Sequence, residues 1–215
     1  MKVLIADDHG IVRQGLASLI NKQPDIEVVG EAKDGREALD LARELSPDIV
    51  IMDVSMPNLN GADATRLILS DNPGIRVIAL SMHTEKRVIR DIIQAGAIAY
   101  VLKSYMFDEL TKALEAAAAG EFYLSPRITG VVLEDYVSQG QRKKKNEPVE
   151  LTVRERQVLQ LTAEGKTVKQ IALQLHVSPK TADATRRKLM NKLDISSIAE
   201  LTKYAIREGI TSTDF

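Results

Sequence analysis

Residues 48–57 read Asp48-Ile49-Val50-Ile51-Met52-Asp53-Val54-Ser55-Met56-Pro57. Ile49 to Met52 show no alternation of apolar and polar residues, so as a strand this segment is buried on both faces, as central strands of parallel α/β sheets are. Asp53 stands at the carboxyl end of the strand. Ligands of open α/β sheets bind just beyond the carboxyl ends of the strands, so an acid at this position is expected to take part in chemistry.

Other strand-like segments also end in polar or charged side chains. Asp7 and Asp8 follow the first such segment of the chain, and two later segments lead into Ser81 and Lys103. Three carboxylates at neighbouring strand ends repel one another, and such a cluster usually persists because a hard divalent cation neutralises it. A hydroxyl, an ammonium, a lone Asp and an acidic pair, each at the end of its own strand, describe a site for a transferred phosphoryl group.

Composition and charge narrow the class of protein. The 215 residues include no cysteine, which removes disulfides and thiolate metal sites and fits a reducing cytoplasm. We recognise no signal peptide and no apolar stretch long enough to span a bilayer, so an intracellular protein without a membrane partner is expected. Residues 1–140 hold 14 Lys and Arg against 21 Asp and Glu, whereas residues 141–215 hold 15 against 9. The acidic part is expected to bind cations, and the basic part to meet a polyanion.

Strand-like and helical patterns alternate five times in residues 1–120. This order predicts an α/β domain with a doubly wound parallel sheet, right-handed crossovers and the flavodoxin-like strand order 2-1-3-4-5. The strands are expected at residues 2–7, 26–30, 48–53, 75–80 and 98–102. The helices are expected near residues 10–21, 35–45, 60–70, 84–94 and 107–119, and Gly120 is expected to end the last of them.

Residues 121–150 are interpreted as a linker. Its first part has an apolar helical pattern that is expected to pack on one of the domains, and its second part has nothing to bury and is expected to be mobile. The basic run at residues 142–145 is interpreted as keeping the linker solvated, with a phosphate-binding arm as the alternative.

Residues 151–215 contain four helical patterns and are expected to form a second, smaller all-α domain. Thr152 and Glu155 have the spacing of a capping box at the start of the first helix. A short helix over residues 168–175 then leads through a tight turn into a third helix that Pro179 begins. Two helices joined by such a turn, the second rich in positive charge, indicate a helix-turn-helix that binds double-stranded DNA.

The strand-end residues resemble the receiver domain of two-component response regulators, with its CheY-like order of Asp-Asp, Asp, Ser or Thr, and Lys. Pro57 and Gly61 also have the spacing of that family's loop. The resemblance implies that a sensor histidine kinase phosphorylates Asp53. It implies Mg²⁺ as the cofactor, and the ligands are then Asp7, Asp8, Asp53 and the backbone carbonyl of Ser55.

The same resemblance assigns roles around the phosphoryl group. Lys103 pairs with the phosphoryl oxygens, Ser81 moves toward them, and Tyr100 reports this switch by turning inward. His83 is interpreted as a loop residue that tunes the access of water. Ser104 stands where many receivers have a proline in a cis bond, which leaves the geometry of the preceding peptide bond open.

The carboxyl-terminal motif residues are Leu151-Thr152, Arg154-Glu155-Arg156, Val158-Leu159, Gly165, Ile171-Ala172, Leu175, Val177-Ser178, Thr181 and Lys192-Leu193. They resemble the LuxR-type (NarL/FixJ) DNA-binding domain. The resemblance places Asp183, Ala184 and Arg187 at bases, facing cytosine, a thymine methyl group and guanine respectively. The residues expected on the same side or at phosphates are Lys180, Thr181, Arg186, Lys188 and Lys192.

The last helical pattern, near residues 196–208, is amphipathic, and one interpretation is that it simply completes a four-helix core. In the family, the exposed face of this helix is used for dimerisation. The residues assigned to that face here are Ile198, Leu201, Thr202 and Ala205.

The resemblance implies a transcription factor controlled by phosphorylation, and not an enzyme. Without phosphate the receiver is expected to pack against the third helix of the second domain and block DNA. Phosphorylation then releases that domain, so that two copies dimerise on DNA, and RNA polymerase is a further candidate partner. Two alternatives stay open. One is a DNA-binding regulator that ignores phosphorylation, and the other is an aspartyl-phosphate hydrolase, which normally needs a second Asp where this chain has Ser55.

Overall fold

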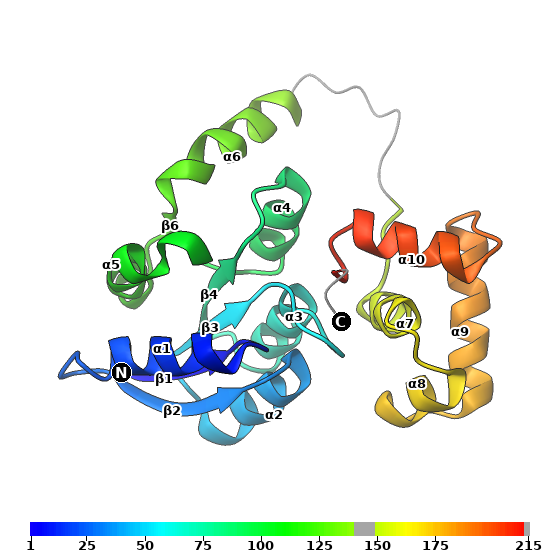
Figure 1. The fold of residues 1–215 in the computed structure, drawn as a ribbon, viewed down its shortest axis with the longest axis horizontal. Coiled ribbons are helices and arrows are strands. Elements are labelled where there is room, and N and C mark those ends of the chain that lie inside the picture. Colours follow the sequence, from blue (N-terminus) through cyan, green and yellow to red (C-terminus); the bar gives the residue numbers. More distant parts are fainter. Residues whose placement is uncertain (140–148, 213–215) are drawn as a thin grey trace. The chain divides into compact units, whose positions relative to one another are not determined.

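The computed structural model describes residues 1–139 and 149–212, and the chain divides into two compact units, Met1–Arg142 and Lys143–Phe215 (Figure 1). The basic run at residues 142–145, predicted to keep the linker solvated, lies outside the described residues. None of the helices in the described ranges combines the length and the apolar character that crossing a bilayer requires.

The first unit is built on a parallel sheet. Its strands are β1 (Lys2–Ala6), β2 (Glu27–Ala32), β3 (Ile49–Asp53), β4 (Arg76–Ser81), β5 (Ala99–Leu102) and β6 (Tyr123–Leu124). Its helices are α1 (Gly10–Ile20), α2 (Gly35–Leu45), α3 (Gly61–Asp71), α4 (Lys86–Gln94), α5 (Met106–Ala119) and α6 (Pro126–Gln139), with a 3-10 turn η1 (Lys103–Tyr105). The strand order β2-β1-β3-β4-β5-β6 confirms the predicted order 2-1-3-4-5 and adds a sixth strand.

Both faces of the sheet are apolar and covered by helices. Val50 and Met52 of β3 belong to a core that includes residues of α2, α3 and α4. Ile49 and Ile51 of the same strand belong to a second core, formed with residues of α1 and α5. Successive side chains of a strand point to opposite faces, so an uninterrupted apolar run is what a strand covered on both sides requires.

The sixth strand was not predicted, because two residues are too short to show a pattern. Tyr123–Leu124 pairs with Ala99 and Tyr100 of β5 in parallel. The chain therefore continues the sheet after Gly120, which has the left-handed φ of 76° expected of a glycine that ends a helix.

The helix α6 packs on α4, so the first part of the predicted linker belongs to the first unit. Ile128 is fully buried in the core on that face, and Val131 and Val132 pack against the same cluster. Lys86 of α4 and Glu134 of α6 form an ion pair with an N···O distance of 2.9 Å. These contacts carry the compact unit past residue 120.

Gly61 begins α3 at a point where the helix touches the strand that carries Asp53. A Cβ atom built at Gly61 would lie 2.1 Å from the carbonyl oxygen of Asp53. The amide of Gly61 donates to the carbonyl oxygen of Val54 at 2.9 Å, which closes the loop after β3. A residue without a side chain is therefore needed for α3 to start this close to Asp53.

The second unit contains the four predicted helices, α7 (Val153–Ala163), α8 (Val168–Gln174), α9 (Pro179–Lys192) and α10 (Ile198–Arg207). The predicted capping box is present, because the Thr152 hydroxyl accepts from the amide of Glu155, whose carboxylate accepts from the amide of Thr152. Ser178 caps α9 and Pro179 occupies its first turn. The helix-turn-helix therefore follows from local signals in the sequence.

We expect Gly61→Ala to lower the free energy of unfolding by about 3 kcal/mol, because the new methyl group overlaps the main chain of Asp53. Gly130→Ala is the matched control, since a Cβ at this exposed position of α6 meets nothing within 4 Å. It is expected to stabilise the protein by roughly 0.5–1 kcal/mol, the usual gain of alanine over glycine in a helix. Chemical denaturation of both variants measures the difference, and equal stabilities would contradict the close approach at Gly61.

Candidate functional site

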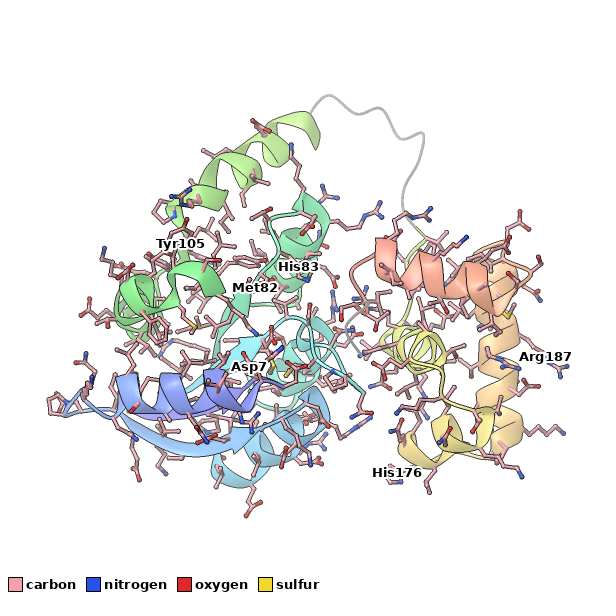
Figure 2. The ribbon with its side chains drawn as sticks, viewed as in Figure 1. Asp7, Met82, His83, Tyr105, His176 and Arg187 are labelled. Atoms are coloured by element: carbon pink, nitrogen blue, oxygen red, sulfur yellow. The ribbon has the colours of Figure 1, made fainter. Side chains whose placement is uncertain are left out.

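Four side chains predicted to form one site lie together at the carboxyl edge of the sheet. Asp7 follows β1, Asp53 and Ser81 are the last residues of β3 and β4, and Lys103 follows β5. Asp7, Asp53 and Ser81 are all buried. Figure 2 shows Asp7 at this edge, on the same side as the loop that carries His83.

Lys103 joins two of the carboxylates. Its Nζ atom lies 2.7 Å from Asp7 Oδ2 and 2.7 Å from Asp53 Oδ2, and its side chain is only 9% exposed. Burial acts to lower the pKa of Lys103, but the negative charges of Asp53 and Asp7 outweigh burial and hold the pKa above its usual value. Lys103 is therefore a fixed positive charge between two acids. The peptide bond to Ser104 is trans, which answers the question that the sequence left open.

Asp53 is the carboxyl group that its surroundings perturb most clearly. Burial raises the pKa of Asp53 to about 7, Lys103 opposes that rise, and the negative charge of Asp7 adds to it. The other carboxylate oxygen, Oδ1, accepts a hydrogen bond from the amide of Ser55 at 3.2 Å. The charged form of Asp53 is thus costly to hold in this pocket without a further cation.

The acidic residues form a group that suits a divalent cation. One ligand atom from each of Asp7, Asp8, His9 and Asp53 can be chosen so that all lie within 4.8 Å of one another. This group has three carboxylates, and Lys103 pairs with two of them, so a cation of charge +2 fits the excess of negative charge and the oxygen donors. The residues present therefore fit the metal that the resemblance implies.

His9 was not among the predicted metal ligands, although it directly follows the acidic pair. Its Nδ1 atom lies 2.7 Å from Asp8 Oδ1 and 3.3 Å from Asp7 Oδ1. The side chain is exposed, so His9 lies at the mouth of the pocket. Its place next to two carboxylates in the sequence was the signal that could have found it.

The two predicted switch residues are linked through the loop after β4. The amide of His83 donates to Ser81 Oγ at 3.0 Å, and the hydroxyl of Tyr100 donates to the carbonyl oxygen of His83 at 2.7 Å. Tyr100 is fully buried, and this burial raises the pKa of Tyr100, so its hydroxyl remains a donor. The structure therefore holds Tyr100 in the inward position.

His83 also connects the two loops that flank Asp53. Its Nε2 atom lies 3.0 Å from the hydroxyl of Ser55, and its Nδ1 atom lies 3.3 Å from Glu85 Oε2. Figure 2 shows His83 beside Met82 in the loop after β4. The sequence marked His83 as a loop residue, but its pairing with Ser55 depends on two loops meeting in space.

Ser125 ties the strand that carries Tyr100 to α6. Its amide donates to the carbonyl oxygen of Tyr100 at 2.9 Å, and its hydroxyl accepts from the amide of Leu102 at 3.2 Å. The same hydroxyl donates to the carboxylate of Glu109 in α5. Ser125 is fully buried, yet no pattern in the sequence marked it.

The third helix of the second unit, α9, presents most of the predicted DNA-binding residues to solvent. The exposed ones are Lys180, Thr181, Ala184, Arg187, Lys188 and Lys192. Figure 2 shows Arg187 extending outward from α9. Asp183 and Arg186 are only partly exposed, because they pair with each other at 2.8 Å.

Lys192 is exposed and also bonds to another helix of the second unit. Its Nζ atom donates to Glu155 Oε2 at 2.9 Å, which joins the end of α9 to the capping box of α7. This hydrogen bond lowers the pKa of Glu155, so the carboxylate stays charged. The pair fixes where α9 lies against α7.

Two of the four residues predicted for a dimerisation face are wrong choices. Leu201 and Ala205 are fully buried in the core that α7, α9 and α10 share, because α10 turns its apolar side to α7. Ile198 is exposed and Thr202 is partly exposed. Only these two of the predicted residues can meet another molecule.

Comparison with known protein families assigns both units. Residues 3–115 match the family of response regulator receiver domains, and residues 149–205 match the bacterial regulatory proteins of the luxR family. The chain belongs to the response regulators. As a member of this family, it is a transcriptional regulator that binds DNA and that is controlled through its receiver domain.

Individual relatives match this chain over nearly its whole length. The transcriptional regulatory protein LiaR of Bacillus subtilis (strain 168) is 38% identical over 212 residues, which cover 99% of this chain and 100% of LiaR. RcsB from Salmonella enterica serovar Typhimurium, bound to the promoter rprA with the phosphomimetic BeF₃⁻, matches 95% of this chain and 97% of its own at 29% identity and a TM-score of 0.61. A structure of two RcsB dimers bound to two parallel DNAs matches the same shares at 27% identity and a TM-score of 0.60.

The raised pKa of Asp53 predicts how stability changes with pH in metal-free buffer. Because the folded-state pKa of about 7 exceeds the ordinary aspartate pKa of 3.8, the folded state binds the proton more tightly, and stability falls as the pH rises between these values. Asp53→Asn removes this loss. A shift of about 3 pKa units corresponds to about 4 kcal/mol, so we expect the variant to exceed wild type by up to this amount at pH 8 and by about 2 kcal/mol or less at pH 5.

Thermal unfolding with a chelator, and then with excess Mg²⁺, measures both effects. Mg²⁺ is expected to raise the melting temperature of the wild type more than that of Asp53→Asn, since a ligand stabilises the state that binds it. A stability difference that is the same at both pH values would contradict the shifted pKa of Asp53.

Proposed function

We propose that Asp53 accepts a phosphoryl group from the histidine of a sensor kinase. One observation carries the proposal: Lys103 lies 2.7 Å from both Asp53 and Asp7, in a buried pocket at the carboxyl edge of the sheet. A carboxylate oxygen of Asp53 forms the new bond to phosphorus, and the bond from phosphorus to the kinase nitrogen breaks. Lys103 is placed to pair with the negative oxygens that then lie beside Asp53.

The proposed cofactor is Mg²⁺, with Asp7, Asp8, Asp53 and the carbonyl of Ser55 as its ligands. When bound, the ion supplies positive charge that stabilises the phosphoryl oxygens during transfer. The support is the acidic group described above, whose ligand atoms lie within 4.8 Å of one another. His9 belongs to this group, and its Nδ1 atom, 2.7 Å from Asp8 Oδ1, is proposed to orient Asp8.

Phosphorylation is proposed to act through Ser81 and Tyr100. Ser81 gives up the amide of His83 and turns its hydroxyl toward the phosphoryl oxygens, while the hydrogen bond to His83 holds Tyr100 inward. The loop that carries His83 then acts on Tyr100 through this hydrogen bond. The strand that carries Tyr100 is in turn tied to α6, because Ser125 is bonded to the main chain on both sides of Val101. We propose that this connection transmits the state of the pocket to the chain that leads into the second unit.

In the second unit, α9 is proposed to enter the major groove. Arg187 pairs with guanine, and Ala184 contacts a thymine methyl group, as their exposure permits. Thr181 and the lysines of α9, which are Lys180, Lys188 and Lys192, meet phosphates, which give affinity without sequence information. The unphosphorylated receiver is proposed to cover α9, and phosphorylation to release it.

The active form is proposed to be a homodimer on DNA, since RcsB has been solved as dimers on DNA. Ile198 and Thr202 of α10 remain available for such a contact. The cytoplasm is proposed as the place of action, because that is where a bacterial regulator meets its DNA, and RNA polymerase is proposed as a further partner.

An enzymatic role is the less favoured alternative. A phosphatase of the haloacid dehalogenase type needs a second acid two residues after the nucleophile, and this position is Ser55, whose hydroxyl is bonded to His83. Turnover of a phosphomonoester would favour the enzyme. A DNA affinity that ignores Asp53 would favour a regulator that does not depend on phosphorylation.

We expect acetyl phosphate with Mg²⁺ to add the mass of one phosphoryl group to the wild type and to shift it from monomer to dimer. Asp53→Asn should show neither change, because an amide is a poor nucleophile. Asp71→Asn is the matched control, since Asp71 lies at the end of α3 and pairs with Arg43, away from the pocket. Intact mass and light scattering measure the two responses. A dimer shift that persists in Asp53→Asn would overturn the proposed switch.

A further inference from the structure

Asp183 is the acidic residue on an otherwise basic helix, and it is fully engaged. Its Oδ1 atom lies 2.8 Å from Arg186 Nη2, and its Oδ2 atom lies 2.7 Å from Arg187 Nη2. Both partners stand on the same side of α9, three and four residues further on. Each oxygen of Asp183 thus already pairs with an arginine of its own helix, whereas the role expected from the sequence was to accept from a cytosine.

The contact with Asp183 has a different effect on Arg186 than on Arg187. Arg186 is 28% exposed, and its Nε atom is buried without a hydrogen-bond partner among the described residues. Asp183 is therefore the charge that holds the Arg186 guanidinium against the domain. Without it, Arg186 would leave a partly desolvated charge unpaired and would turn outward to water or phosphate.

Arg187 is 76% exposed and is held only at one end of its guanidinium. A long side chain that is free on a helix surface samples many rotamers and contacts any phosphate within reach. A side chain held by a carboxylate four residues earlier keeps its remaining N–H groups in one direction. Directed donors read base edges, whereas undirected donors add affinity for every sequence.

We propose that Asp183 is a positioning residue for DNA specificity, which holds Arg186 away from the phosphates and aims Arg187 at the bases. This inference rests on the proposed role of α9 in the major groove. The negative charge of Asp183 also repels the DNA backbone, so Asp183 lowers the affinity for DNA that lacks the correct bases. Correct bases offset that repulsion because they accept from the aligned Arg187.

The test compares selected with scrambled DNA. Full-length wild-type protein, treated with acetyl phosphate and Mg²⁺, first selects a sequence from a random pool of duplexes. Binding to that duplex and to its scrambled version is then measured over a series of KCl concentrations for wild type, Asp183→Asn and Asp183→Glu. Asp194→Asn removes the same charge from an exposed position just after α9, so it is the matched control.

Asp183→Asn is expected to bind scrambled DNA at least about threefold more tightly than the wild type. The plot of the logarithm of the binding constant against the logarithm of the KCl concentration is expected to be steeper by about 1 for each arginine that is freed to meet a phosphate. Its preference for the selected duplex is expected to fall by about tenfold, the usual effect of one misplaced base contact. Asp183→Glu keeps a carboxylate within reach of both arginines and should retain most of the wild-type preference.

Three results would overturn the inference. One is an unchanged preference in Asp183→Asn, and another is an equal loss of preference in Asp194→Asn, which would reduce the effect to net charge. The third is a loss in Asp183→Glu as large as in Asp183→Asn, which would assign the effect to the shape of the aspartate instead of its pairing. These three results leave the proposed role of α9 intact. A wild type that selects no sequence at all would instead overturn the proposed role of α9, and with it this inference.

Discussion

The contact of Lys103 with Asp7 and Asp53 is the interaction on which the site depends. Two buried carboxylates at neighbouring strand ends repel each other, and the ammonium 2.7 Å from each offsets this repulsion. The compensation is incomplete, because the pKa of Asp53 still rises to about 7. The pocket is thus short of positive charge, and its oxygen donors suit a divalent cation.

Hydrogen bonds connect that pocket to the rest of the first unit. The loop after β4 bonds to both Ser81 and Tyr100, and β5 is bonded on its far side to β6 and to Ser125 at the start of α6. The burial of Ile128 fixes α6 on the same face of the sheet as α4. A segment whose sequence suggests a connector is therefore joined to the strand that carries Tyr100.

In the second unit, too, charged side chains are held by charges of opposite sign, but here the excess charge is positive. Its helix α9 is basic, and a single carboxylate, Asp183, pairs with two of its arginines. Lys192 is likewise engaged by Glu155, so that charge on α9 serves the fold as well as binding. Exposed charge gives affinity for any polyanion, whereas charge held in place can distinguish one sequence from another.

The sequence alone determined the strand order, the strand-end chemistry and the helix-turn-helix, because these follow from local periodicity, caps and the shared edge of parallel strands. Tertiary structure decided what depends on neighbours distant in the chain. It buried Leu201 and Ala205, which an amphipathic pattern could not assign to a core or to a partner, and it joined Ser55 to His83. It also set the pKa of Asp53 and attached α6 through a two-residue strand, since burial and long-range pairing exist only once the chain has folded.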